Sequence, residues 1–222
     1  MSAVRRRCAR CAAVLPPHRQ RARSKGVASD LQALKDELAR FGSANDARES
    51  ARDRRMLNIT PDTGALLAVL VRATGARRVL EIGTSNGYST VWLAEAAAAI
   101  GGHVTTVELA ADKVALAQAT LARSGLAASV DVVHGDGGAW LTQAASASVD
   151  LVFLDSARDA YVRWWPALRR VLRHGGLLVV DNALSHADEL APFTALLAAD
   201  PAITCSVVPV GNGELLAVCG AA

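Results

Sequence analysis

The residues best suited to bind a cofactor lie between positions 79 and 90, which read Val-Leu-Glu-Ile-Gly-Thr-Ser-Asn-Gly-Tyr-Ser-Thr. An apolar run is followed there by two glycines, Gly83 and Gly87, and then by an Ala-rich stretch. A strand, a glycine loop and a helix in this order bring the backbone close to a nucleotide-like ligand. The G-x-x-x-G spacing differs from the G-x-G-x-x-G of dinucleotide-binding proteins, so we expect another cofactor.

Two carboxylates near this loop indicate what it binds. Glu81 stands just ahead of Gly83, where a carboxylate would repel a pyrophosphate but would suit a positively charged cofactor. S-adenosylmethionine (SAM) brings such charge through its sulfonium and ammonium groups. Glu108 follows Gly87 by about 20 residues, where an acid at a strand end can accept both ribose hydroxyls. The pattern predicts a SAM site; a Rossmann-like turn with a different ligand is the alternative.

Three oxygen-bearing side chains end two further apolar runs. Asp155 follows the run at 150–154, and Asp181 and Asn182 follow the run at 177–180. Ligands of open α/β sheets bind at the carboxyl ends of strands, and neighbouring strand tips lie about 5 Å apart. Two carboxyl groups at such a short distance would not both ionise in an apolar crevice without a cation.

Two carboxylates and an amide oxygen suit Mg²⁺, Ca²⁺ or Mn²⁺. An acceptor with two adjacent hydroxyls would fill two of the remaining coordination positions, and water the third. In the alternative interpretation, Asp155 is the acid that lies beside the cofactor in such folds, and Asp181 and Asn182 form a cap or a turn.

These side chains need a sheet whose strand ends meet at one edge. We expect strands at 78–82, 103–108, 130–134, 149–154, 177–181, 203–208 and 214–219, and helices at 87–100, 110–124, 137–145, 158–172 and 187–199. This alternation predicts a parallel sheet covered on both faces. The short connection Pro209-Val-Gly-Asn-Gly213 makes the last strand antiparallel. Before the sheet we expect helices at 29–41, 45–57 and 62–74.

Composition places these elements in one domain. A chain of 222 residues that is 51% hydrophobic fits a single α/β domain, which we assign to 28–222. Positions 1–27 hold eight basic residues and no acid, and we expect a disordered basic tail there. The rest is mildly acidic, which gives no support for a nucleic-acid surface. No apolar run reaches the roughly 18 residues of a membrane span. The four cysteines are expected to be reduced thiols, consistent with a cytoplasmic protein.

Residues 56–219 resemble the cation-dependent O-methyltransferases, the group that includes caffeoyl-CoA and catechol O-methyltransferases. The resemblance rests on Val79-Leu-Glu-Ile-Gly83, Gly87-Tyr-Ser89, Glu108, Asp150-Leu-Val-Phe-Leu-Asp155, Gly175-Gly-Leu-Leu-Val-Val-Asp-Asn182 and Pro209–Gly213. It implies a Rossmann-like SAM-methyltransferase fold of seven strands with extra N-terminal helices. It also implies a cation, most simply Mg²⁺, held by Asp155, Asp181 and Asn182.

The resemblance further assigns the cofactor site. Asn58 and Ile59 belong to a segment over the methionine end of SAM, and Asp136 and Gly137 match residues beside the adenine. The remaining SAM-binding candidates are Glu81, Gly83, Ser89, Glu108 and Asp155.

One position departs from the family pattern. The family shows a Lys, proposed as the general base, where this chain has Arg158. Arg stays protonated in proteins and cannot take the substrate proton. Because a divalent cation lowers the pKa of a hydroxyl that it binds, we expect Arg158 to stabilise the oxyanion while Asp159 or His186 passes the proton to water. Asp155, Arg158 and Asp181 are thus the catalytic candidates; a surface charge at Arg158 and an ordinary loop histidine at His186 are the alternatives.

The acceptor site is expected next to the cation. Tyr161 and Trp164 follow Asp155 closely and are candidates, with His186, for contacts to an aromatic acceptor; a core or dimer contact is equally compatible with them. The resulting hypothesis is methyl transfer from SAM to a hydroxyl of a small catechol-like or vicinal-diol acceptor. We expect neither nucleic-acid nor membrane partners, and a homodimer as in the family. The alternatives are an N- or RNA methyltransferase, with the basic head as a tether, and a non-catalytic SAM-binding protein.

Overall fold

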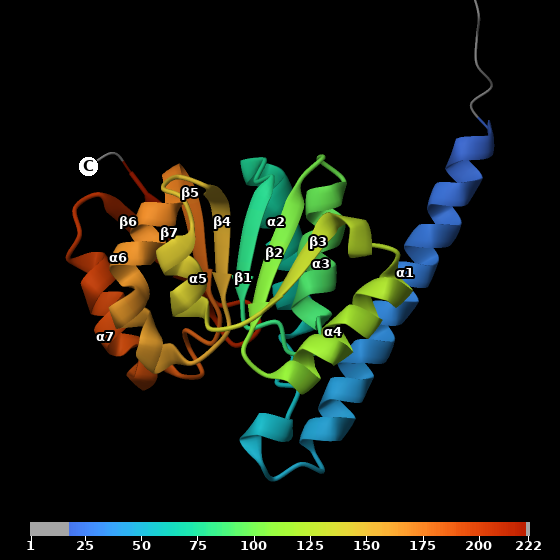
Figure 1. Ribbon diagram of the computed structural model, residues 1–222, viewed down its shortest axis with the longest axis horizontal. Coiled ribbons are helices and arrows are strands. Elements are labelled where there is room, and N and C mark those ends of the chain that lie inside the picture. Colours follow the sequence, from blue (N-terminus) through green and yellow to red (C-terminus); the bar gives the residue numbers. More distant parts are fainter. Residues whose placement is uncertain (1–17, 221–222) are drawn as a thin grey trace, which may run out of the picture.

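A seven-stranded sheet forms the centre of the molecule in the computed structural model, which describes residues 18–220. The strands are β1 (Arg78–Ile82), β2 (His103–Glu108), β3 (Val130–His134), β4 (Val149–Leu154), β5 (Leu172–Val180), β6 (Ile203–Val208) and β7 (Glu214–Cys219). Their order in the sheet is β3-β2-β1-β4-β5-β7-β6 (Figure 1). Strands β1 to β5 pair in parallel, whereas β7 pairs antiparallel with both β5 and β6. This confirms the predicted fold class.

Helices cover both faces of the sheet. They are α1 (His18–Asp46), α2 (Pro61–Thr74), α3 (Tyr88–Ala98), α4 (Ala111–Ser124), α5 (Gly137–Gln143), α6 (Tyr161–Val171) and α7 (Ala187–Ala198), with single 3₁₀ turns η1 (Arg52–Arg54), η2 (Ala127–Ser129) and η3 (Arg158–Ala160). One core contains α1 to α4 and the other contains α5 to α7. Successive strand residues point to opposite cores, as Phe153 and Leu154 do, because side chains alternate along a strand.

Most elements agree with those expected from the sequence. Strand β5 begins at Leu172 rather than at 177, and the helix expected at 158–172 is divided into η3 and α6. Thr60 caps α2 by accepting the Thr63 amide, and Pro61 follows in the first turn, where a missing N–H costs nothing. No helix within residues 18–220 is long and apolar enough to cross a membrane.

The region before α2 differs from the expectation. A single helix, α1, begins at His18 and continues past Gly42 to Asp46, and the helix predicted at 45–57 is wrong. A Cβ at Gly42 would lie 2.4 Å from the Asn58 amide nitrogen, so Gly42 permits close approach rather than ending the helix. Residues 47–60, here called the cover segment, fold back because the Asp46 carboxylate accepts the backbone amides of Met56 and Leu57, at 2.6 and 2.8 Å.

The ends of the chain leave some expectations untested. The predicted disorder of the tail at 1–27 falls largely on residues 1–17, which lie outside the described residues, as do Cys8 and Cys11. Within the described part, Cys205 and Cys219 are free thiols.

Candidate active site

A cavity of about 1060 Å³ opens at the carboxyl ends of the parallel strands, beneath the cover segment. This volume is at the upper end of the range for small-molecule sites and has room for a cofactor together with a small acceptor. Most of the predicted site residues line it: Asn58, Ile59, Gly83, Ser89, Glu108, Asp136, Gly137, Asp155, Arg158, Trp164, Asp181, Asn182 and His186. Glu81 and Tyr161 do not.

Gly83 explains how the cavity floor can form. It has a φ of 109°, in the region that favours glycine, and a Cβ there would lie 2.0 Å from the Asp155 carbonyl oxygen. Backbone hydrogen bonds connect neighbouring strand tips across the cavity floor. The Asp155 amide donates to the Ile82 carbonyl at 3.0 Å, and the Asp181 amide donates to the Leu154 carbonyl at 3.1 Å. The glycine therefore brings the loop after β1 into direct contact with the tip of β4, where the candidate cation ligands begin.

Glu108 stands at the tip of β2 in the position expected of a ribose ligand. Its two carboxylate oxygens accept the backbone amides of Ser85 and Ala110, at 2.8 and 2.9 Å. Each oxygen can accept a further hydrogen bond, and the residue lines the cavity. The backbone therefore holds the carboxylate in place before any ligand arrives.

Glu81 lies behind the cavity wall rather than in it. The residue is completely buried, and its carboxylate accepts hydroxyl hydrogen bonds from Ser89 at 2.6 Å and Thr106 at 2.7 Å, and another from Thr90. Burial raises the pKa of Glu81 to about 7 although these three donors favour its charged form. Glu81 thus orients Ser89, which does line the cavity, instead of joining the other predicted ligands there.

Asp155, Asp181 and Asn182 come together as the sequence suggested. Strands β4 and β5 are neighbours with Leu154 opposite Val180, so their tips are adjacent. The Asn182 amide nitrogen lies 2.7 Å from an oxygen of Asp181 and 3.4 Å from an oxygen of Asp155. Burial raises the pKa of both aspartates, and for Asp155 the neighbouring Asp181 charge raises it further. The arrangement places two carboxyl groups together at one point of the cavity wall, where a cation would favour their ionised form.

This set fits a hard divalent cation. The Asp181 Oδ1 atom is buried and has no hydrogen-bond partner within residues 18–220, so it is left with an unused acceptor. The described residues contain no group of three His, Cys, Asp or Glu side chains arranged to hold a metal, and the candidate set is instead two carboxylates and one amide. The Asn182 amide now points its nitrogen at both aspartates and would present its oxygen to a cation after a 180° flip, which exchanges two nearly isosteric groups.

Arg158 lies beside these acids. It is 8% exposed, and its Nε donates to Glu189 at 2.9 Å. Its charge lowers the pKa of Asp155 and Glu189. Its terminal nitrogens make no hydrogen bond with the described residues, and it lines the cavity, so they remain available to a ligand. His186 also lines the cavity, and its Nδ1 lies 2.9 Å from the Ser185 hydroxyl, whereas Asp159 is exposed at the rim.

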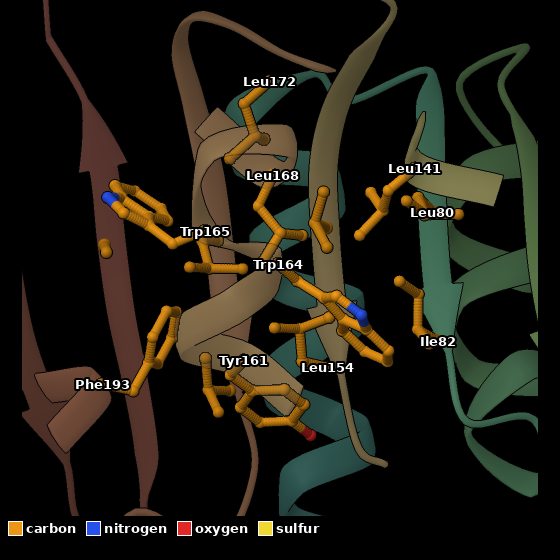
Figure 2. Close-up of a cluster of buried hydrophobic side chains, with 14 of the residues drawn as sticks. Leu80, Ile82, Leu141, Leu154, Tyr161, Trp164, Trp165, Leu168, Leu172 and Phe193 are labelled. Atoms are coloured by element: carbon orange, nitrogen blue, oxygen red, sulfur yellow. The ribbon is translucent and has the colours of Figure 1, made fainter. Parts of the chain in front are cut away.

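The aromatic candidates Tyr161 and Trp164 both belong to α6, and only Trp164 lines the cavity. Tyr161 is 1% exposed, its hydroxyl accepts the Ser156 amide at 2.8 Å, and its ring packs against Trp164 and Phe193 (Figure 2). Trp164 reaches the cavity next to Gly138, where a Cβ would lie 2.4 Å from its indole nitrogen. Trp164 therefore borders the end predicted to hold adenine, and its contact with an acceptor stays a prediction, whereas Tyr161 belongs to the core and does not line the cavity.

Two groups of site residues were missed in the sequence. The cover segment supplies Arg52, Asp53 and Met56 to the lining, and it is fastened to the rest of the site because Ser85 Oγ donates to the Met56 carbonyl at 2.7 Å and Lys113 Nζ donates to that of Arg55. The second is Glu214, which is buried against Asp181. Neither carries a motif: the segment resembles a charged helix, and Glu214 depends on the pairing of β7.

Comparison with known proteins agrees with this site. Residues 32–219 match a family model described as O-methyltransferase. A catechol O-methyltransferase from Mycobacterium tuberculosis is 38% identical over 150 residues, covering 66% of this chain and 64% of that protein, less than two thirds of its length. Cofactor-bound Rv0187 from MTB has a TM-score of 0.69 at 32% identity, covering 82% of this chain and 88% of that structure.

A second similar structure was solved with SAM bound. The O-methyltransferase TomG from Streptomyces achromogenes, involved in tomaymycin synthesis and crystallised with SAM, has a TM-score of 0.70 at 26% identity, covering 86% of this chain and 90% of that one. Several residues of the motifs on which the sequence-based family prediction depended, among them Gly83, Glu108 and Asp155, line the cavity at the strand tips. The match over residues 32–219 shows that the chain belongs to the O-methyltransferase family, which confirms that prediction.

Proposed function

We propose that this protein transfers the methyl group of SAM to a hydroxyl of a small acceptor with two adjacent hydroxyls, such as a catechol, with the help of a divalent cation. The observation that carries the proposal is the convergence of Asp155, Asp181 and Asn182 in the wall of the same cavity that the Gly83 loop and Glu108 line. Similarity to a protein named catechol O-methyltransferase supports the class of acceptor.

The chain's own residues would bind SAM along the cavity. Glu108 accepts the ribose hydroxyls, and Asp136 and Gly137 lie beside the adenine, with Trp164 next to them. Asn58 and Ile59 in the cover segment and Ser89 on α3 enclose the methionine end. Glu81 holds the Ser89 hydroxyl and adds a buried carboxylate near the positive end of the cofactor.

The acceptor would lie against the acids at the other end. Asp155, Asp181 and Asn182 would hold a divalent cation, whose positive charge would favour the deprotonated form of an acceptor hydroxyl. Arg158 places its free guanidinium nitrogens where negative charge develops on the acceptor, while Glu189 fixes its orientation. Asp159 and His186 both line the cavity, and one of them would pass the acceptor's proton to water. Alignment of the nucleophile with the methyl group supplies much of the rate.

A panel of matched acceptors tests the proposal. Catechol should be methylated in the presence of SAM and Mg²⁺, whereas phenol and catechol monomethyl ether, which lack the second free hydroxyl, should not. EDTA should abolish the reaction, and added Mg²⁺ or Mn²⁺ should restore it. Persistent activity in EDTA would remove the cation from the proposal, and equal rates with phenol would remove the vicinal diol. The homodimer expected from the family remains a prediction.

A further inference from the structure

Glu214 lies close to Asp181 at the end of the β5–β7 pairing. That antiparallel pairing ends with Val180 opposite Leu215, and extending its register by one residue brings Asp181, which directly follows β5, opposite Glu214, the first residue of β7. Side chains that face each other across an antiparallel pair have Cβ atoms about 5 Å apart. Glu214 is completely buried and Asp181 is 4% exposed, so two acids face each other where water cannot screen them.

The two side chains leave complementary atoms unused. Asp181 Oδ2 accepts the Asn182 amide, and Glu214 Oε1 accepts the Thr63 hydroxyl at 3.0 Å. The remaining oxygens, Asp181 Oδ1 and Glu214 Oε2, are buried without a hydrogen-bond partner among residues 18–220, and the two carboxyl groups lie close enough to influence each other.

Glu214 does not reach the cavity, whereas Asp181 does. It therefore lies behind Asp181, on the side away from a ligand. Its own position is fixed at the start of α2, because Thr63 donates to it while the Thr60 hydroxyl donates to Thr63 at 3.2 Å. In metal sites, a partner behind a ligand that sets its orientation commonly changes cation affinity by 10- to 100-fold when removed.

We propose that Glu214 is a positioning residue of the candidate cation site: it contacts the Asp181 carboxyl from behind and sets the direction in which that group faces the cavity. This inference rests on the proposed role of Asp181 as a cation ligand. Glu214 touches neither the cavity nor an acceptor, and its effect passes entirely through Asp181.

Cation affinity, measured without turnover, tests this role. Mn²⁺ binding to the full chain would be followed by electron paramagnetic resonance for the wild type and for Glu214→Leu and Glu214→Gln. Leu removes the contact with Asp181 and should weaken Mn²⁺ binding by about 10- to 100-fold. Gln keeps the length of the side chain, can donate its amide to Asp181 and can still accept from Thr63, so its affinity should remain near that of the wild type.

Two further variants complete the design. Asp150→Asn alters a buried acid of β4 at the opposite end of the sheet, bonded to Arg78, and should leave Mn²⁺ affinity unchanged. Thr63→Val removes the hydrogen bond that holds Glu214 and leaves Asp181 unchanged, so it should also weaken Mn²⁺ binding. This variant tests the positioning role if Glu214→Leu does not fold. Circular dichroism would check the fold of each variant.

The outcomes separate the two proposals. Wild-type affinity in Glu214→Leu, or in Thr63→Val where the Leu variant does not fold, would overturn the positioning role while leaving the cation site intact. A Gln variant as weak as the Leu variant would also overturn it. A wild-type chain that binds no Mn²⁺ would refute the cation part of the proposed function and the positioning role together.

Discussion

Replacing Glu81 by Gln should remove the part of the pH dependence of folding stability that is caused by titration of the Glu81 carboxyl. The Glu81 carboxyl is completely buried, and burial raises its pKa from 4.5 to about 7. One pKa unit corresponds to 1.36 kcal/mol, so ionising this buried group costs about 3 kcal/mol more in the folded chain than in the unfolded chain. Because the folded state binds this proton more tightly, the stability contributed by the protonated carboxyl is fully present below pH 4.5 and is lost as pH rises to about 7.

Gln is neutral throughout this range and keeps an oxygen that can accept the Ser89 hydroxyl. We therefore expect the free energy of unfolding of Glu81→Gln, relative to that of the wild type, to increase by about 3 kcal/mol between pH 4.5 and 7.5. For a chain of this length that corresponds to a relative rise in Tm of about 10 °C. Urea unfolding and thermal melts of both proteins at matched pH values would measure the difference, since the other acids titrate in both.

Asp150→Asn is the matched control. Burial alone would raise the pKa of Asp150, but hydrogen bonds from the Arg78 side chain and backbone and from the Arg77 amide lower it to about 2. Its contribution to stability is present above its ordinary pKa of 3.8 and is lost only as pH falls through about 2, so this variant should differ from the wild type by a constant amount between pH 4.5 and 7.5. A difference between Glu81→Gln and the wild type that does not change over this range would refute the reasoning about Glu81.

Three further predictions concern the candidate site. Asp155→Asn and Asp181→Asn should each abolish methyl transfer and also the stabilisation of about 2.7 kcal/mol that a cation supplies at 100 times its Kd. Thermal melts with and without Mg²⁺ measure this loss, and a retained shift would exclude the residue as a ligand. Arg158→Ala should lower kcat by about 10²- to 10³-fold, as loss of an oxyanion donor does, with unchanged affinity for the cofactor; full turnover at every pH would exclude the role. Ser89→Ala should weaken binding of S-adenosylhomocysteine by roughly tenfold or more in calorimetry, because it removes a hydrogen bond to a charged group. An unchanged Kd would place the methionine end elsewhere.

Much of the sheet was predictable because its strands are buried on both faces. Such strands are near-continuous apolar runs, so their limits are visible in the sequence, and β1 and β4 agree to the residue. The cover segment was not predictable in the same way. Its path depends on distant contacts, with Asp46 accepting two of its amides and Gly42 leaving room for Asn58, and no local pattern describes such contacts.

The candidate ligands were predictable for a related reason. Parallel strands end at one edge, so polar residues immediately after β1, β2, β4 and β5 meet there whatever the details of packing. This brought Glu108, Asp155 and Asp181 into one prediction. The rule does not cover residues on helices. Trp164 and Tyr161 lie one turn apart on α6 and both join the hydrophobic cluster (Figure 2), yet only Trp164 also lines the cavity.

By itself, the sequence predicted the order of strands and helices and the oxygen-bearing side chains at the strand tips, because these follow from local composition and spacing, and its motifs carried the resemblance to the family. Only the tertiary structure decided that Glu81 holds the Ser89 hydroxyl from behind the cavity wall, and that Glu214 is buried close to Asp181. Both depend on which strands become neighbours and in what register. That pairing is set by packing over the whole sheet, and a single strand's sequence does not contain it.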